Sequence, residues 1–326
     1  MTYRPEDILS ALTYDPITHH IIVCSITVKF WPFKTQEEIK TSHESAVSFA
    51  RYNHHFDAVV SGDDGGFIAV WDIENGKLMS KFQTKSNVSP QLSKSTNPKI
   101  TTGTFDMKGR RLITSAADGT VKIWNFSNGQ QLKDLLSADE KPRVDTEITA
   151  LISIHDPPKK KDQKDTVQKV KNPCFLAVGW DKKLHIWIDP AHNEDDDGEE
   201  DDAISCRDLP ATTPPYVHTQ DIMSCTFDVK TMLIFTGGVD GTIVAWNLET
   251  GFARYYLHEY DPTCRSDNHV KDSKSVDALV VLDEKRILIS MSADQILRFW
   301  DLTDMQSQKG PILTMNADHY NEYSKD

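Results

Sequence analysis

Aspartate, histidine and serine or threonine recur in this sequence at fixed distances before a tryptophan, and together they are the residue types of a hydrolytic site. Four aspartates precede a tryptophan by six residues: Asp118, Asp181, Asp240 and Asp294. Four hydroxyl residues precede one by ten residues: Ser61, Thr114, Thr236 and Ser290. His43 and His218 each precede theirs by 28 residues. An enzyme needs its catalytic set once, whereas this set recurs along the chain, so the repetition predicts a structural role and no enzyme activity.

The tryptophans mark an internal repeat. Six of the seven close one pattern, which is an apolar strand, a tight turn rich in Asp and Gly, and an alternating strand. Clear copies end at Trp71, Trp124, Trp187, Trp246 and Trp300, and a weaker copy ends at Trp31. The turn favours Asp or Gly because it is short and because a carboxylate accepts hydrogen bonds from nearby backbone N–H groups. Repeated strand–turn–strand units predict an all-β fold.

Copies such as VVSGDDGGFIAVWD and LIFTGGVDGTIVAWN resemble the repeats of WD-repeat β-propellers, in which each repeat forms a four-stranded antiparallel blade. The resemblance implies a buried hydrogen-bonded set of His, Ser or Thr, Asp and Trp in each blade. Its members would be His43, Ser61, Trp71, Thr114, Asp118, Trp124, Asp181, Trp187, His218, Thr236, Asp240, Trp246, Ser290, Asp294 and Trp300. Only the fifth repeat is expected to have all four, because Gly65 replaces the aspartate of the second. The third and sixth repeats lack the histidine and are expected to be held more by packing.

The repeats predict one propeller domain over residues 1–326. The expected units are about 7–41, 43–83, 100–136, 147–210, 218–258 and 275–315, with a tail at 316–326. Their first strands are expected at 7–12, 46–49, 100–105, 148–154, 222–227 and 276–282. Seven blades are usual in the resembling family, so two alternatives stay open. The six units form a ring of their own, or they are part of a seven-bladed or tandem propeller in a longer protein.

Four long insertions, at 83–99, 156–172, 193–202 and 258–274, are where binding function is expected, because loops on a rigid scaffold often carry it. The candidate residues are Lys159, Lys160, Lys161, Asp195, Asp196, Asp197, Tyr256 and His258. The lysine-rich and carboxylate-rich loops are expected on the same side of the fourth blade. They are either solvated loops that partly neutralise each other, or a docking surface of two signs. An acidic filament such as a microtubule would bind the lysines, and a basic tail would bind the carboxylates.

Composition and missing motifs exclude several function classes. The formal net charge of −13 argues against nucleic acid or a membrane surface as the main partner. Eight carboxylates lie within 194–202, so the rest of the chain is only mildly acidic. No apolar run approaches the length that spans a bilayer. Phosphate-loop, dinucleotide, nucleophile-elbow and zinc-protease motifs are absent, and the five cysteines have no metal-ligand spacing, so no cofactor or metal is expected.

A narrower resemblance covers about residues 145–302, including HTQDIMSCTFDVKTMLIFTGGVDGTIVAWNLETG. This region resembles the large, often EF-hand-containing WD-repeat proteins of cilia and sperm flagella. The resemblance implies a cytoplasmic, cytoskeletal scaffold of the axoneme, near doublet microtubules, with tubulin or other axonemal proteins as partners. The alternative is a soluble cytosolic adaptor, for ubiquitin ligation or signalling, that binds peptides on the top face of the propeller.

Overall fold

The computed structural model describes residues 11–15, 20–24, 28–32, 43–84, 98–135, 146–155, 170, 173–189, 205–210, 218–257, 275–306 and 310–316. These residues form strands and turns, and no helix that could cross a membrane occurs among them. The chain divides into two compact units, residues 1–153 and 154–326, and each is described by itself. Seven of the candidate binding residues lie outside the described ranges: Lys159, Lys160, Lys161, Asp195, Asp196, Asp197 and His258.

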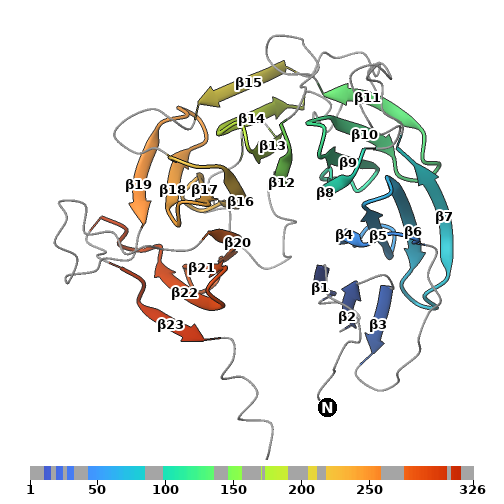
Figure 1. Ribbon diagram of the computed structural model, residues 1–326, viewed down its shortest axis with the longest axis horizontal. Helices are drawn as coiled ribbons and strands as arrows, with labels where there is room; N and C mark the ends of the chain where they lie inside the picture. Colours follow the sequence, from blue (N-terminus) through green and yellow to red (C-terminus); the bar gives the residue numbers. More distant parts are fainter. Residues whose placement is uncertain are drawn as a thin grey trace, which may run out of the picture. The chain divides into compact units, whose positions relative to one another are not determined.

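The first unit contains three antiparallel sheets in which consecutive strands are neighbours (Figure 1). The first sheet is β1 (Ala11–Asp15), β2 (His20–Cys24) and β3 (Val28–Pro32). The second is β4 (Val47–Asn53), β5 (Ala58–Asp63), β6 (Phe67–Asp72) and β7 (Leu78–Gln83). The third is β8 (Ile100–Phe105), β9 (Arg111–Ala116), β10 (Val121–Asn125) and β11 (Gln131–Leu135). The boundary between the units falls near the end of β12 (Ile148–Ile154).

The remaining sheets have the same strand order. The fourth sheet is β12, β13 (Cys174–Gly179), β14 (Lys183–Ile188) and β15 (Ser205–Pro210). The fifth is β16 (Ile222–Asp228), β17 (Leu233–Gly238), β18 (Ile243–Asn247) and β19 (Ala253–Leu257). The sixth is β20 (Val276–Leu282), β21 (Ile287–Ser292), β22 (Ile296–Asp301) and β23 (Leu313–Asn316).

The predicted fold class is confirmed, because the described residues form successive four-stranded antiparallel sheets of the WD-repeat β-propeller type. The first sheet departs from the pattern. Its described residues form three strands. The first strand predicted at 7–12 overlaps β1 at residues 11 and 12, and residues 7–10 lie outside the described ranges. Trp31 pairs with Ile21, ten residues before it, whereas the later tryptophans pair with a residue twelve before, as Trp71 does with Val59. This shorter hairpin explains why the polar offsets fail in the first repeat. The single-domain assignment stays a prediction.

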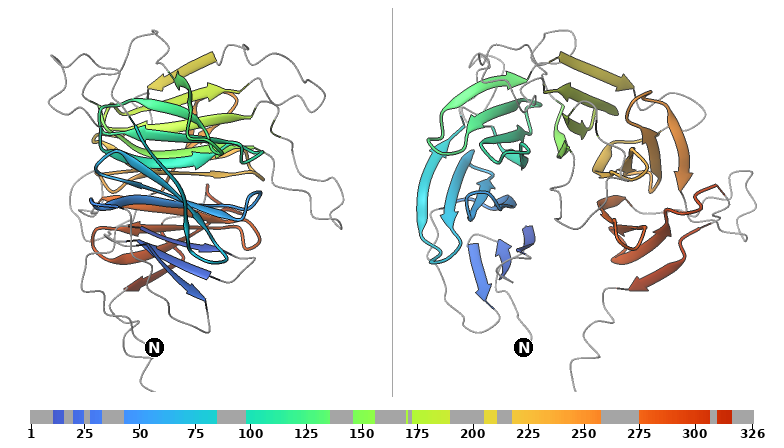
Figure 2. Two further views of the ribbon diagram at one scale, coloured as in Figure 1. Left: turned by 90° about the vertical axis from the view of Figure 1, so that its right-hand side faces the viewer. Right: turned by 180° about the vertical axis from the view of Figure 1, so that it is seen from behind.

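Neighbouring sheets lie beside each other within each unit (Figure 2), and buried apolar side chains pack between them. In the first unit, Val60 and Ile68 of the second sheet share a buried cluster with Leu112 and Trp124 of the third. In the second unit, Phe235 of the fifth sheet packs in the same way with Trp300 of the sixth. The inner strands β5, β13 and β17 are buried at every position, which explains why most of their residues are apolar or small.

In the second to sixth sheets, the turn between the second and third strands contains a residue with positive φ. Its position is five residues before the repeat tryptophan. Glycine fills it at Gly66, Gly119 and Gly241, with φ of 79°, 80° and 75°. Lys182 and Gln295 adopt the same conformation, with φ of 56° and 63°. A side chain in this region costs about 1 kcal/mol, because Cβ approaches the backbone. The fourth and sixth sheets therefore carry strain that the other turns avoid.

Replacing Gln295 by glycine should relieve this strain and raise the free energy of unfolding by about 0.5–1 kcal/mol. The converse change Gly119→Ala should lower it by at least a similar amount, because alanine disfavours a φ of 80°. Urea denaturation of the two variants and the unaltered chain measures both effects. A loss of stability in Gln295→Gly would contradict the prediction.

Candidate functional site

The fifth sheet brings together the four residues expected of its repeat. Trp246 on β18 donates from Nε1 to Thr236 Oγ1 at 2.8 Å, and the same oxygen lies 2.7 Å from His218 Nε2. His218 precedes β16, and Asp240 lies in the turn between β17 and β18. The other imidazole nitrogen, Nδ1, lies 3.1 Å from Thr242 Oγ1 and 3.6 Å from Asp240 Oδ1. The Thr242 hydroxyl donates to that carboxylate at 2.6 Å. A continuous polar chain thus links the tryptophan to the turn.

The charge state of Asp240 depends on this chain. Burial by itself raises its pKa, but hydrogen bonds from His218, Thr242 and Thr219 outweigh burial and hold the pKa well below its usual range. Tyr256, a candidate partner-binding residue, is half-buried beside this site on β19 and pairs with Val244. Burial and the Asp240 carboxylate raise the pKa of its phenol, and a hydrogen bond with Thr242 opposes them. The Tyr256 side chain therefore interacts with the polar chain of its own sheet.

The second sheet corrects one expectation, because it also holds a complete set. Its aspartate is Asp63, two residues before Gly65. Asp63 Oδ2 lies 2.6 Å from His43 Nδ1, and His43 Nε2 lies 2.7 Å from Ser61 Oγ. Trp71 donates to the same Ser61 oxygen at 2.8 Å. Asp63 Oδ1 accepts the backbone N–H groups of Gly65 and Phe67, so a carboxylate at the end of β5 still closes the turn.

The third, fourth and sixth repeats have no histidine 28 residues before the tryptophan. Each of them instead has a basic or imidazole side chain two residues before the tryptophan. These residues are Lys122, His185 and Arg298, whereas the histidine-containing sheets have Ala69 and Val244 there. All three side chains belong to buried residues within an otherwise apolar strand. A buried charge or polar group is costly unless it is paired. In the fourth and sixth sheets, the position therefore supplies a partner for the turn aspartate from within the sheet.

The contacts of these residues support this exchange. His185 Nε2 lies 2.7 Å from Asp181 Oδ2, and Arg298 Nη2 donates to Asp294 Oδ2 at 2.7 Å. In the third sheet, burial lowers the pKa of Lys122, while the carboxylates of Asp134 and Asp118 raise it electrostatically. The sixth sheet, which is expected to be held more by packing, also has an ion pair in which both Arg298 amino groups contact Asp294. The sequence signal for this exchange was the residue two positions before the tryptophan. It is Lys, His or Arg in VKIW, LHIW and LRFW, and it is apolar in the histidine-containing repeats, IAVW and IVAW.

Ser61, His43 and Asp63 are connected in space as in a catalytic serine triad. His43 Nε2 lies 2.7 Å from Ser61 Oγ, and His43 Nδ1 lies 2.6 Å from Asp63 Oδ2. The environment gives them another role. Ser61 has no exposed surface, and the Trp71 indole donates to the oxygen that would have to attack a substrate. No substrate reaches this oxygen in the folded sheet, so the three residues hold the turn in place.

The described residues contain no group of three His, Cys, Asp or Glu side chains that could hold a metal ion. Cys174 and Cys225 are buried free thiols. Burial raises the pKa of the Cys174 thiol to about 12, so this thiol stays protonated and is a poor nucleophile at neutral pH. Among the described side chains, the cysteines therefore offer packing and no redox or nucleophilic chemistry.

Trp180 is an exposed residue that the sequence interpretation missed. It is the seventh tryptophan, and the only one that does not end a repeat. It lies in the turn between β13 and β14, and 47% of its surface is exposed. Its equivalents in other turns include Ala117, Val239 and Ala293. A large exposed aromatic on a tight, hydrogen-bonded turn is suited to bind a protein partner. Its signal in the sequence was a tryptophan at a turn position where the other clear repeats have Asp, Ala or Val.

Asp63 and Asp64 offer a matched pair for testing the buried set. Replacing Asp63 by alanine should lower the free energy of unfolding by about 3 kcal/mol, because it leaves His43 buried without its carboxylate. Replacing Asp64 should cost about 0.5 kcal/mol, because its contact with Lys99 at 3.3 Å is solvent-exposed. Urea denaturation measures both. Equal losses in the two variants would show that the buried contact does not stabilise the sheet.

The depressed pKa of Asp240 predicts a pH dependence. A carboxylate with a lowered folded-state pKa stabilises the fold above its unfolded pKa of about 4, and this stability is lost as the pH falls further. The Asp240→Asn variant should therefore differ most from the unaltered chain near pH 7, and the difference should shrink below about pH 4. Thermal unfolding at several pH values measures it. A difference that grows on acidification would have the wrong sign for this mechanism.

Comparisons with known proteins agree with the geometry. The family model "WD domain, G-beta repeat" matches residues 90–125 and 212–247. The "WD repeat-containing protein on Y chromosome" of Drosophila willistoni is 29% identical over 224 residues, which are 67% of this chain and 17% of that protein. Its counterpart in Drosophila mojavensis is 27% identical over 226 residues, which are 68% of this chain and 15% of that protein. The matched segment is thus a small part of these relatives.

The names of these relatives do not mention cilia or microtubules, so the ciliary assignment stays a prediction. The repeat model nevertheless ends at Asn125 and Asn247, each one residue after a tryptophan that is hydrogen-bonded to the threonine ten positions before it. The repeat found by counting residues, the repeat in the sheets and the repeat in the comparison are therefore the same unit. The chain contains WD repeats.

Proposed function

We propose that this chain is a non-catalytic scaffold for protein–protein interaction and, more narrowly, a docking component of the ciliary axoneme beside doublet microtubules. WD repeats generally mediate interactions between proteins. The observation that most supports the scaffold role is that Trp180 is exposed on a turn whose next residue, Asp181, is fixed by a hydrogen bond with His185. The repeated polar residues are bonded within their own sheets, so they hold the surface that presents this side chain.

The turn that carries Trp180 is held by hydrogen bonds of the two residues that follow it. Asp181 contacts His185 at 2.7 Å and accepts the Lys183 backbone N–H at 3.2 Å. Lys182 donates from Nζ to the Thr219 carbonyl at 2.9 Å. A turn held in this way loses little backbone entropy on binding, and burial of the Trp180 ring supplies a large apolar contact. A partner surface with an apolar recess would fit it.

The axonemal part of the proposal rests on the resemblance of residues 145–302 to ciliary WD-repeat proteins and on the lysines at 159–161. Tubulin surfaces are acidic, so these lysines are the proposed contact with the microtubule. The soluble adaptor is the competing proposal, and the Trp180 turn would serve it equally well by binding a peptide. Cellular location separates the two proposals, because the adaptor needs no attachment to the axoneme.

Co-sedimentation with salt-stripped axonemes tests the proposal. The Trp180→Ala variant should bind about tenfold more weakly, which corresponds to a loss of about 1.4 kcal/mol at a central interface aromatic. Phe252→Ala is the matched control. Phe252 is 66% exposed and lies in the turn between β18 and β19, at the other end of β18 from the β17–β18 turn, which is the equivalent of the turn that carries Trp180. It should bind as the unaltered chain does.

Two other results have separate meanings. Unchanged binding of both variants would remove Trp180 from the interface. If the unaltered chain does not sediment with axonemes and is diffuse in the cytosol of a ciliated cell, the axonemal role is wrong. Capture of a peptide through Trp180 in that case would favour the adaptor. Replacing the three lysines at 159–161 by glutamate should reduce microtubule binding if that loop is a contact.

A further inference from the structure

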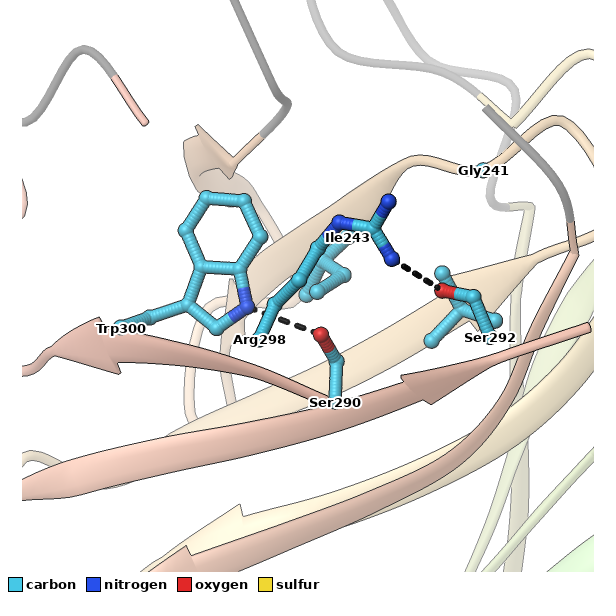
Figure 3. A pocket seen from close by; sticks show the side chains of 7 residues that line it. Gly241, Ile243, Ser290, Ser292, Arg298 and Trp300 are labelled. Atoms are coloured by element: carbon cyan, nitrogen blue, oxygen red, sulfur yellow. Dashed lines mark hydrogen bonds between the residues drawn. The ribbon is translucent and has the colours of Figure 1, made fainter. Parts of the chain in front are cut away.

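A small cavity lies between the fifth and sixth sheets of the second unit, and we propose that it is a built hydration site for one water molecule. Its volume is about 10 Å³. It is lined by Gly241, Ile243, Val276, Ser290, Ser292, Arg298 and Trp300 (Figure 3). A cavity of this size accommodates about one water, provided that polar groups line it.

The cavity borders a serine whose equivalents in two other sheets contact an imidazole. Ser290 is the sixth-sheet equivalent of Ser61 and Thr236, since each lies ten residues before its tryptophan. In those sheets the hydroxyl oxygen contacts both the indole nitrogen and His Nε2, the latter at 2.7 Å. In the sixth sheet Trp300 donates to Ser290 at 2.9 Å, and Asp272, not histidine, stands 28 residues before Trp300. The second polar contact of this hydroxyl therefore needs another source.

Arg298 does not supply that contact. Its guanidinium group is directed to the turn, with Nη2 2.7 Å from Asp294 Oδ2 and Nη1 3.3 Å from Ser292 Oγ. Figure 3 shows the arginine reaching Ser292 while the Trp300 indole reaches Ser290. Asp294 thus has a basic partner, but no histidine contacts the Ser290 hydroxyl among the described residues. With arginine in place of histidine, the turn aspartate Asp294 has its partner. Within the described ranges, the Ser290 hydroxyl at the other end of the polar chain keeps only its contact with Trp300.

A water molecule satisfies the chemistry of this gap. Ser290 and Ser292 are 1% and 6% exposed, and a buried hydroxyl whose hydrogen has no acceptor is destabilising. The water accepts the hydrogen of Ser290 and exchanges a second hydrogen bond with Ser292, while Ile243 and Val276 form its apolar wall. The Arg298–Asp294 pair is already neutral as a unit, so nothing at the site favours an ion over water. The volume excludes a larger ligand.

The substitution Ser290→Thr tests the site. It keeps the hydroxyl, adds one methyl group beside the cavity, and reproduces the residue of the fifth sheet. Magnetic relaxation dispersion of water in solutions of the full chain counts long-lived internal waters. The variant should have one fewer than the unaltered chain. Ser61→Thr is the matched control, because His43 occupies the corresponding space in the second sheet, and it should leave the number unchanged. An unchanged number in Ser290→Thr would overturn the proposal.

A crystal structure of the unaltered chain, at a resolution that shows ordered water, provides an independent test that needs no variant. One isolated density peak within hydrogen-bond distance of Ser290 Oγ is expected. An empty cavity would overturn the proposal. Density continuous with a side chain from residues 258–274 would overturn it as well, because a protein group would then replace the imidazole.

Discussion

An aspartate at the turn before the tryptophan strand is the constraint on which the rest of the second, fourth, fifth and sixth sheets depends, and its side chain is at most 17% exposed in these sheets. The carboxylate closes a tight turn by accepting backbone N–H groups, as Asp63 does from Gly65 and Phe67. Its negative charge must then be matched, because an unpaired buried charge destabilises a fold by several kcal/mol. The structure shows two sources of the matching group. It is a histidine from the segment before the first strand, or a basic residue on the tryptophan strand itself.

The two sources differ in what they connect. His218 bridges the turn and the Thr236 hydroxyl, so the tryptophan, the inner strands and the preceding segment form one polar unit. Arg298 and His185 reach their aspartates from four residues away, so in these two sheets the turn is fixed by a residue of the tryptophan strand. The long insertions of this chain lie in or beside the three repeats without this histidine.

The same residue types serve catalysis in other proteins, and burial decides the difference. Ser61, His43 and Asp63 have triad distances, yet the serine is inaccessible and its oxygen already accepts the Trp71 indole. Polar groups used in this way rigidify the sheets, and recognition is left to side chains that project from the turns. Trp180 is such a side chain, and its turn is held by the contacts of Asp181 and Lys182.

The sequence by itself determined the repeat, the all-β class and the strand positions, because alternation and turn chemistry act between near neighbours. The strands β8, β12 and β20 have the predicted bounds. Three features became visible only in the folded chain. They are the carboxylate that pairs with His43 in the second sheet, the strand residues that contact the turn aspartate in place of a histidine, and the exposure of Trp180. These outcomes depend on where side chains point and what buries them. Asp63 and His43 are twenty residues apart, and only the folded sheet brings their atoms to 2.6 Å.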